Sequence, residues 1–102
     1  MRIDDIIVKL REVTSGLLTG RSSVFLRMAL DMAREAERHG VPAMDVAVDA
    51  HKILEQPLLE RRSADIDILR LKAARVCREL EAKWDSAPQP TYELEDVIPI
   101  DD

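Results

Sequence analysis

The sequence has few of the residues that form disulfides, tight turns and aromatic cores. It contains one cysteine, Cys77, three glycines and three aromatic residues, Phe25, Trp84 and Tyr92. A single cysteine excludes a disulfide within the chain and fits a reducing compartment. Alanine, leucine, arginine and glutamate are abundant instead, and this composition favours helix over sheet.

Long apolar runs are missing as well. No run approaches the roughly 18 residues of a membrane-spanning helix. Asp4 and Asp5 interrupt the first ten residues, which therefore lack the apolar centre of a secretion signal. A chain of 102 residues that is 46% hydrophobic is expected to form one domain with a modest core. We expect a soluble cytoplasmic protein, and the excess of arginine over lysine, eleven to four, favours a bacterial or phage source.

Charge is distributed unevenly along the chain. Residues 1–84 carry fifteen basic and fourteen acidic side chains, a net charge of +1. Residues 85–102 carry six acidic side chains and no basic one, a net charge of −6. The body is therefore nearly neutral, and the last segment supplies the acidity of the whole chain.

Apolar residues recur at helical spacing in four segments of the sequence. Gly16 and Gly20 punctuate the connection after the first segment, and Gly40 and Pro57 mark the ends of the second and third. The predicted helices cover residues 3–13, Ser22 or Ser23 to about His39, about 43–56, and 63 to about 84.

Four helices with short connections predict an all-α protein, a small four-helix bundle with an extended acidic C-terminal tail. Pro88 and Pro90 separate a helical bundle domain, residues 1–86, from a Pro-bounded tail of acidic and aliphatic residues, 87–102. The third helix has apolar residues over more than half of its circumference, so we expect it to be buried between the others. The predicted core includes Leu10, Phe25, Met32, Ile53, Leu69 and Val76.

Residues with catalytic or metal-binding potential are few. His51 and Glu55 are four residues apart and can hold two ligands of a metal, but no further histidine or cysteine motif completes a site. Cys77 lies on the apolar stripe of the fourth helix, where a buried thiol is unreactive. We therefore expect no catalytic residue, no metal and no cofactor, and we predict that the protein is not an enzyme.

One short pattern indicates a different function. The segment REAERH, Arg34 to His39, resembles the Arg-x4–6-His signature of the HEPN superfamily. Proteins of that superfamily are helical bundles, many are RNases of bacterial conflict systems, and they commonly act as dimers. The resemblance covers six residues and implies that Arg34 and His39 are site residues. Glu35 stands where the family usually has Asn or Asp.

A second candidate surface combines a loop with basic residues. Leu17 and Leu18 are expected to close one end of the core. The basic residues are predicted to form a stripe on the outer side of the fourth helix, which Glu79 interrupts. Because the tail is acidic and would oppose phosphate, we expect no nucleic-acid partner. The residues of this second surface are Leu17, Leu18, Arg61, Lys72, Arg75 and Arg78.

The tail contains the segment TYELEDVIPI, which mixes carboxylates with apolar and β-branched residues and is predicted to be extended. A solvated spacer needs no apolar residues, so two uses remain. The tail can pack on its own bundle, or it can add a strand to the exposed sheet edge of a partner, at which Pro99 is tolerated. The predicted partner-binding residues are Tyr92, Leu94, Glu95, Asp96, Val97, Ile98 and Ile100.

We interpret the chain as a non-enzymatic protein-binding module, a small adaptor, regulator or inhibitor that uses its C-terminal peptide and a helix face. The alternative is a helical protein that acts on nucleic acid, such as a HEPN-like RNase of a conflict system. Formation of a homo-oligomer is left open, and no contact with a membrane is expected.

Overall fold

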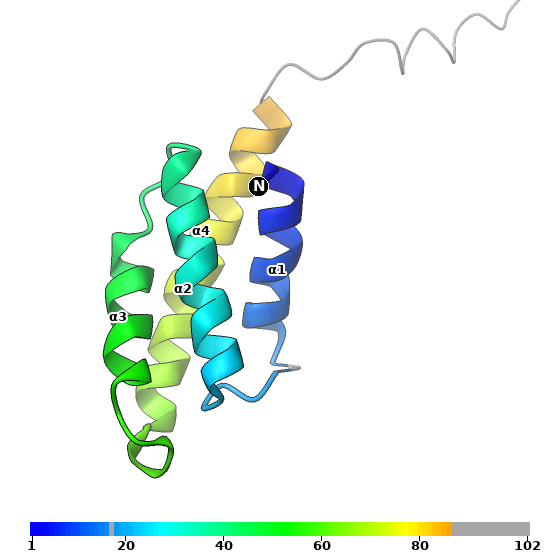
Figure 1. Ribbon diagram of the computed structural model, residues 1–102. Helices are drawn as coiled ribbons and strands as arrows, with labels where there is room; N and C mark the ends of the chain where they lie inside the picture. The colour runs from blue at the N-terminus through cyan, green and yellow to red at the C-terminus, as the bar shows by residue number, and fades with distance from the viewer. Residues whose placement is uncertain (17, 87–102) are drawn as a thin grey trace, which may run out of the picture.

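The computed structural model describes residues 1–16 and 18–86, which form an all-α bundle without a strand among them (Figure 1). The four helices are α1 (Ile3–Ser15), α2 (Ser23–Arg38), α3 (Met44–Leu54) and α4 (Ser63–Ser86), with a 3-10 turn at Leu58–Glu60. The prediction of an all-α fold with four helices is confirmed. Leu17 and the predicted tail lie outside the described residues, and the proposed domain boundary stays a prediction.

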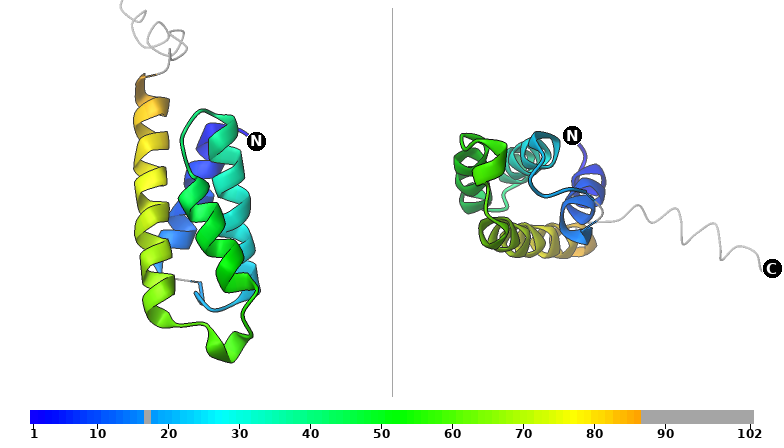
Figure 2. Two further views of the ribbon diagram at one scale, coloured as in Figure 1. Left: turned by 90° about the vertical axis from the view of Figure 1, so that its left-hand side faces the viewer. Right: turned by 90° about the horizontal axis from the view of Figure 1, so that it is seen from below.

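The four helices surround a common interior. Seen end-on, α2 lies between α1 and α3, and α4 runs along the opposite side of the bundle (Figure 2). The interior contains all six residues that the sequence predicted for the core, and it takes buried residues from every helix. None of the helices in the described ranges is long and apolar enough to cross a membrane.

Local signals in the sequence explain where the helices begin and end. The Ser22 hydroxyl oxygen accepts a hydrogen bond from the Phe25 backbone amide at 3.1 Å, which caps α2. Gly16 and Gly40 follow the ends of α1 and α2 with φ values of 85° and 84°, a left-handed conformation that favours glycine. At the start of α3 a side chain from α2 takes the place of a local cap, because the Glu37 carboxylate accepts the Ala43 amide at 2.7 Å.

One side of α3 is open to solvent, so the prediction that α3 is buried between the other helices is wrong. Val46, Ala50 and Ile53 are buried. On the other side, Met44 is 62% exposed and Val48 is 42% exposed. The physical reason is that α3 lies at the margin of the bundle, with α2 and α4 as its only helical neighbours among the described helices. The apolar residues therefore extend further around α3 than its packing does.

A buried arginine joins three segments at one end of the bundle. Arg61 is 6% exposed, and its guanidinium donates to the carbonyl oxygens of Gln56 at 3.1 Å and Leu54 at 3.3 Å, at the end of α3. It also donates to the Arg21 carbonyl and, at 3.4 Å, to the Ser23 hydroxyl in the first turn of α2. The predicted place of Arg61 in an exposed stripe on the fourth helix is therefore wrong, because it precedes α4 and its side chain is turned inward.

A second arginine secures the end of α1. Arg70, on α4, donates to the Val13 carbonyl at 2.6 Å and to the Leu18 carbonyl at 3.1 Å. Its guanidinium carbon lies 4.7 Å from the centre of the Phe25 ring, within the range of a cation–π contact. Leu18 is half-buried against the core, as expected for a residue that closes one end of it.

The first prediction concerns the core. Leu69 is fully buried, so we expect Leu69→Ala to lower the free energy of unfolding by about 2–5 kcal/mol. Leu71 lies two residues further along α4 and is 70% exposed, so Leu71→Ala is the matched control and is expected to change stability little. Urea denaturation followed by circular dichroism measures both. Equal effects of the two substitutions on stability would contradict the burial of Leu69 in the core.

The second prediction concerns Arg61. A lysine keeps the charge but has no planar fork, so Arg61→Lys loses several of the bonds to carbonyl oxygens and should destabilise the protein by about 1–3 kcal/mol. The exposed neighbour Arg62 provides the control, Arg62→Lys, for which we expect almost no change. Denaturation of both variants under identical conditions checks this. If Arg61→Lys is as stable as Arg62→Lys, the hydrogen bonds of the buried guanidinium do not contribute to stability.

Candidate partner-binding surfaces

The basic residues of α4 connect α4 to α3. Lys72 donates to the Asp49 carboxylate at 2.7 Å, and this hydrogen bond raises the pKa of Lys72. Arg75 bonds Glu79 on its own helix at 2.7 Å and Asp45 on α3 at 2.9 Å. Two of the four residues of the predicted stripe, Lys72 and Arg75, are therefore paired with carboxylates, and both contribute an ion pair between α3 and α4.

The other predicted contact residues are placed apart or lie outside the described part. Arg78 is exposed on α4, whereas Leu18 belongs to the connection between α1 and α2, at the end of the bundle that Arg70 secures. Leu17 and the predicted tail residues fall outside the described residues. Among the described residues, Leu18 and Arg78 are therefore not part of one surface, and the role of all the predicted contact residues in partner binding stays a prediction.

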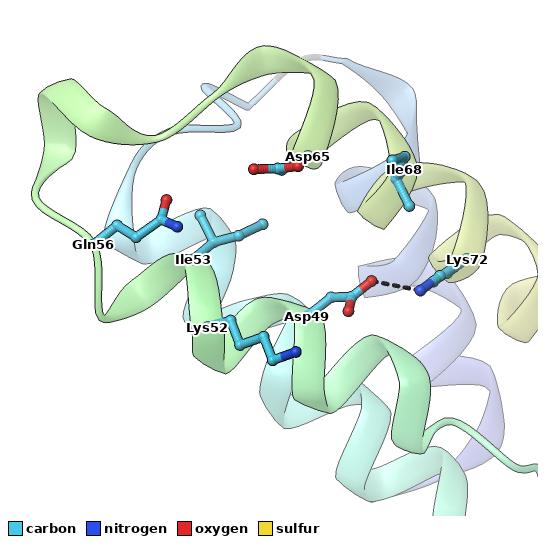
Figure 3. A pocket seen from close by; sticks show the side chains of 7 residues that line it. All are labelled: Asp49, Lys52, Ile53, Gln56, Asp65, Ile68 and Lys72. Carbon is cyan, nitrogen blue, oxygen red and sulfur yellow. Dashed lines mark hydrogen bonds and ion pairs between the residues drawn. The ribbon is translucent and has the colours of Figure 1, made fainter.

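A small pocket lies between α3 and the first half of α4, with a volume of about 330 Å³ (Figure 3). Its charges are balanced, because two carboxylates and two ammonium groups line it and the Asp49–Lys72 bond crosses it. The side-chain oxygen of Gln56 is buried there and accepts no hydrogen bond from a described residue. The lining residues are Asp49, Lys52, Ile53, Gln56, Asp65, Ile68 and Lys72. Balanced charge gives this pocket no preference for an anion or a cation.

The seam between α2 and α3 is open and apolar. A groove of about 770 Å³ follows the two helices, and we call it the α2–α3 groove. Met44 and Val48 are the exposed apolar residues of its α3 wall. Leu30 and Ala47 are partly buried residues that pack against the core beneath. Sequence reasoning missed this groove, although the surplus of apolar residues around α3 was the signal for it.

Charged residues border the α2–α3 groove on both walls. Arg38 is paired with Glu35 at 2.8 Å, and the Glu37 carboxylate accepts the Ala43 amide. Arg34 on α2 and Lys52 on α3 also line the groove. Neither of these two cations has an ion pair with another described residue. Lys52 also lines the pocket between α3 and α4, and the Glu55 carboxylate lines the groove on the α3 wall. The groove therefore has an apolar floor and walls that carry three cationic and two anionic side chains.

The histidines that the sequence singled out lie in different surroundings. His51 lies 3.2 Å from Glu55, as their spacing predicted, and both are exposed. No group of three or more metal-ligating side chains exists within residues 1–16 and 18–86. His39 contacts the Met1 carbonyl oxygen at 2.7 Å, whereas Arg34 lines the α2–α3 groove.

Comparison of the chain with models of known protein families, with curated proteins and with solved structures finds no match. No relative therefore assigns a role to any residue of this chain. The fold alone does not supply a function, which depends on the chemistry of the surfaces.

The third prediction concerns Cys77, which is buried next to the Ile7 carbonyl. Burial raises the pKa of the thiol, and the nearby negative charge of Glu81 adds to this effect. Because the thiolate is the reactive form, we expect Cys77 to react slowly with Ellman's reagent at pH 8 in the native protein and rapidly in denaturant. The exposed position of Arg78 supplies a control, Arg78→Cys in a Cys77→Ala background, which should react rapidly without denaturant. Equally rapid reaction of native Cys77 would contradict its burial.

Proposed function

We propose that this protein is a non-enzymatic protein-binding module, a small adaptor, regulator or inhibitor. The α2–α3 groove is its main contact surface on the bundle. The ligand that fits this groove is a peptide segment whose apolar side chains are flanked by carboxylates. The observation that carries this proposal is the combination of an apolar floor with walls on which cations outnumber carboxylates by three to two.

The apolar part of the groove supports a binding role because it is continuous. Single exposed apolar residues are common on proteins and need no explanation. Here Met44 and Val48 share one hollow with Leu30 and Ala47, which come from two different helices. A peptide in this hollow would remove the exposed methyl groups from water, and each Å² of apolar surface buried stabilises a complex by about 25 cal/mol before binding costs.

The charged part of the groove supports the choice of an acidic ligand. Arg34 and Lys52 stand on opposite walls, so a peptide between them has a cation on either side. Carboxylates on the ligand would increase the association rate and select against basic peptides. Because both cations are exposed, their contribution would weaken as salt is added.

The tail is the second proposed contact. Its predicted binding residues, among them Leu94, Ile98 and Ile100, would give a partner an extended strand with apolar side chains. Carboxylates such as Glu95 and Asp96 would mainly steer the encounter with a basic partner. This contact is proposed from the sequence alone.

The HEPN-like RNase remains the alternative function. Arg34 lies within α2, whereas His39 is the residue that follows its last residue, Arg38. Arg34 faces α3, whereas His39 contacts the Met1 carbonyl. RNA cleavage by the purified protein that is lost in both Arg34→Ala and His39→Ala would favour this alternative over the binding module.

The fourth prediction tests the groove in the full chain. The probe is a fluorescein-labelled peptide that alternates aliphatic and acidic residues, Leu-Glu-Ile-Asp repeated over twelve positions. We expect Val48→Asp to weaken its binding on the order of tenfold, because a carboxylate in the groove repels the probe and removes apolar contact. Fluorescence anisotropy measures the affinity, at low salt and again at high salt.

Two controls accompany this titration. Leu71→Asp places the same carboxylate on the exposed face of α4, away from the groove, and should leave affinity unchanged. A probe with lysine in place of the acids should bind much more weakly. Equal loss of affinity in Val48→Asp and Leu71→Asp, or equal binding of the lysine probe, would contradict the proposed site.

A further inference from the structure

The last turn of α4 lies beside the connection that leads into the α2–α3 groove. A Cβ atom placed on Gly40 would lie 3.5 Å from the Lys83 ammonium nitrogen. Gly40 belongs to the connection between α2 and α3, and Met44, the first residue of α3, lines the groove. Residue 87 is four positions after Lys83 in the sequence. The tail therefore follows a part of α4 whose side chains reach the connection between α2 and α3.

The tail is long enough to reach and follow the groove. Helix α3 has 11 residues, so the groove along it is about 16 Å long at 1.5 Å per residue. An extended chain covers up to about 3.3 Å per residue, so residues 87–102 can span roughly 50 Å. Arg75 pairs with Asp45 next to Met44, and Ser86 lies eleven residues beyond Arg75, about 16 Å along the axis of α4. The reach of the tail exceeds this offset and the length of the groove together.

The chemistry of the tail matches the chemistry of the groove. Residues 87–102 contain five carboxylate side chains and no lysine or arginine. They are interspersed with apolar side chains, of which Leu94, Val97 and Ile98 are the central ones. The groove offers the complement, an apolar floor between Arg34 and Lys52. This is the ligand class that the proposed function requires, and the chain carries it within itself.

We propose that the α2–α3 groove is occupied by residues 87–102 of the same chain. This inference rests on the proposed function, because it uses the preference of the groove for acidic apolar peptides. A second copy of the protein is a poorer occupant, since the α2–α3 face carries more cations than carboxylates and two such faces have no excess of acidic groups to offer each other. A tethered segment also has a high effective concentration at the groove, which favours binding within one chain.

Occupation by the tail would regulate both contact surfaces at once. A partner of the groove must displace the tail, so its apparent affinity falls by the fraction of molecules whose groove is open. The same displacement releases the tail residues that are proposed to bind a partner. Binding at the groove and exposure of the tail are thereby coupled.

The fifth prediction is tested by NMR on the full chain with 13C-labelled methionine methyl groups. Met44 lies in the groove, whereas Met28 and Met32 are buried or half-buried residues of α2 outside it, so they serve as internal references. We expect the Met44 methyl resonance to move in the variant Val97→Ser/Ile98→Ser/Ile100→Ser and to remain in place in Gln89→Ser/Thr91→Ser. The first variant removes predicted contacts of the tail, and the second alters tail residues outside them. An identical Met44 resonance in the wild type and the first variant would overturn the inference.

Dilution distinguishes a groove occupied by the tail of its own chain from a groove occupied by the tail of a second copy. A Met44 resonance that is unchanged on tenfold dilution is expected for a tail bound within its own chain. A resonance that moves toward the position seen in the triple serine variant would show that the tail comes from a second copy, and would overturn the proposal of a contact within one chain. Addition of 1 M NaCl is expected to move the resonance in the same direction at any protein concentration, since salt screens the cations.

The acidic probe separates this inference from the proposed function. We expect it to bind the triple serine variant about tenfold more tightly than the wild type, because the competing tail has been weakened. Equal binding to both proteins would overturn occupation by the tail and leave the groove as a binding site. Absence of binding to the triple serine variant would overturn the proposed function itself.

Discussion

The buried guanidinium of Arg61 is the interaction on which the arrangement of the helices depends. A cation withdrawn from water needs fixed oxygen atoms around it, and Arg61 obtains them from the end of α3, from the connection before α2 and from the first turn of α2. The carbonyl oxygens at the end of a helix carry partial negative charge and suit a cation. Because α4 begins at Ser63, two residues after Arg61, the position of Arg61 also fixes where α4 starts.

The two sides of α3 differ in how they meet their neighbours, and the proposed function follows from this difference. Toward α4, Asp49 and Asp45 pair with Lys72 and Arg75, so the charges there are matched within the bundle. Toward α2, the outer part of the contact is left open as an apolar groove bordered by cations. A ligand on the first side would compete with existing ion pairs. On the second side it would find apolar surface and more cations than carboxylates.

Much of the fold was predictable because its signals are local. Periodic apolar residues placed the four helices, and Ser22 caps α2 as its position indicated. The burial of Arg61 was not predictable from the sequence. An arginine that follows a connecting segment looks the same in sequence whether its side chain faces solvent or is surrounded by carbonyl oxygens. The sequence did not predict the solvent-exposed side of α3. The burial of a helix depends on how many helices pack around it, and the spacing of its apolar residues does not reveal that number. The ion pairs to α4 join residues that are distant in sequence, so spacing along one helix did not indicate them.

Native-state hydrogen exchange tests most directly whether Arg61 makes the connections part of the cooperative core. The informative amides are those of Ser22 and Arg61, which bond the Thr19 and Leu58 carbonyls at 3.1 Å and 3.3 Å within the two connections. If the buried guanidinium holds these segments, both amides exchange only on global unfolding, with the same free energy of opening as the amide of Leu69 in the centre of α4. Exchange of the Ser22 and Arg61 amides through local opening, at a free energy far below that of Leu69, would contradict this account.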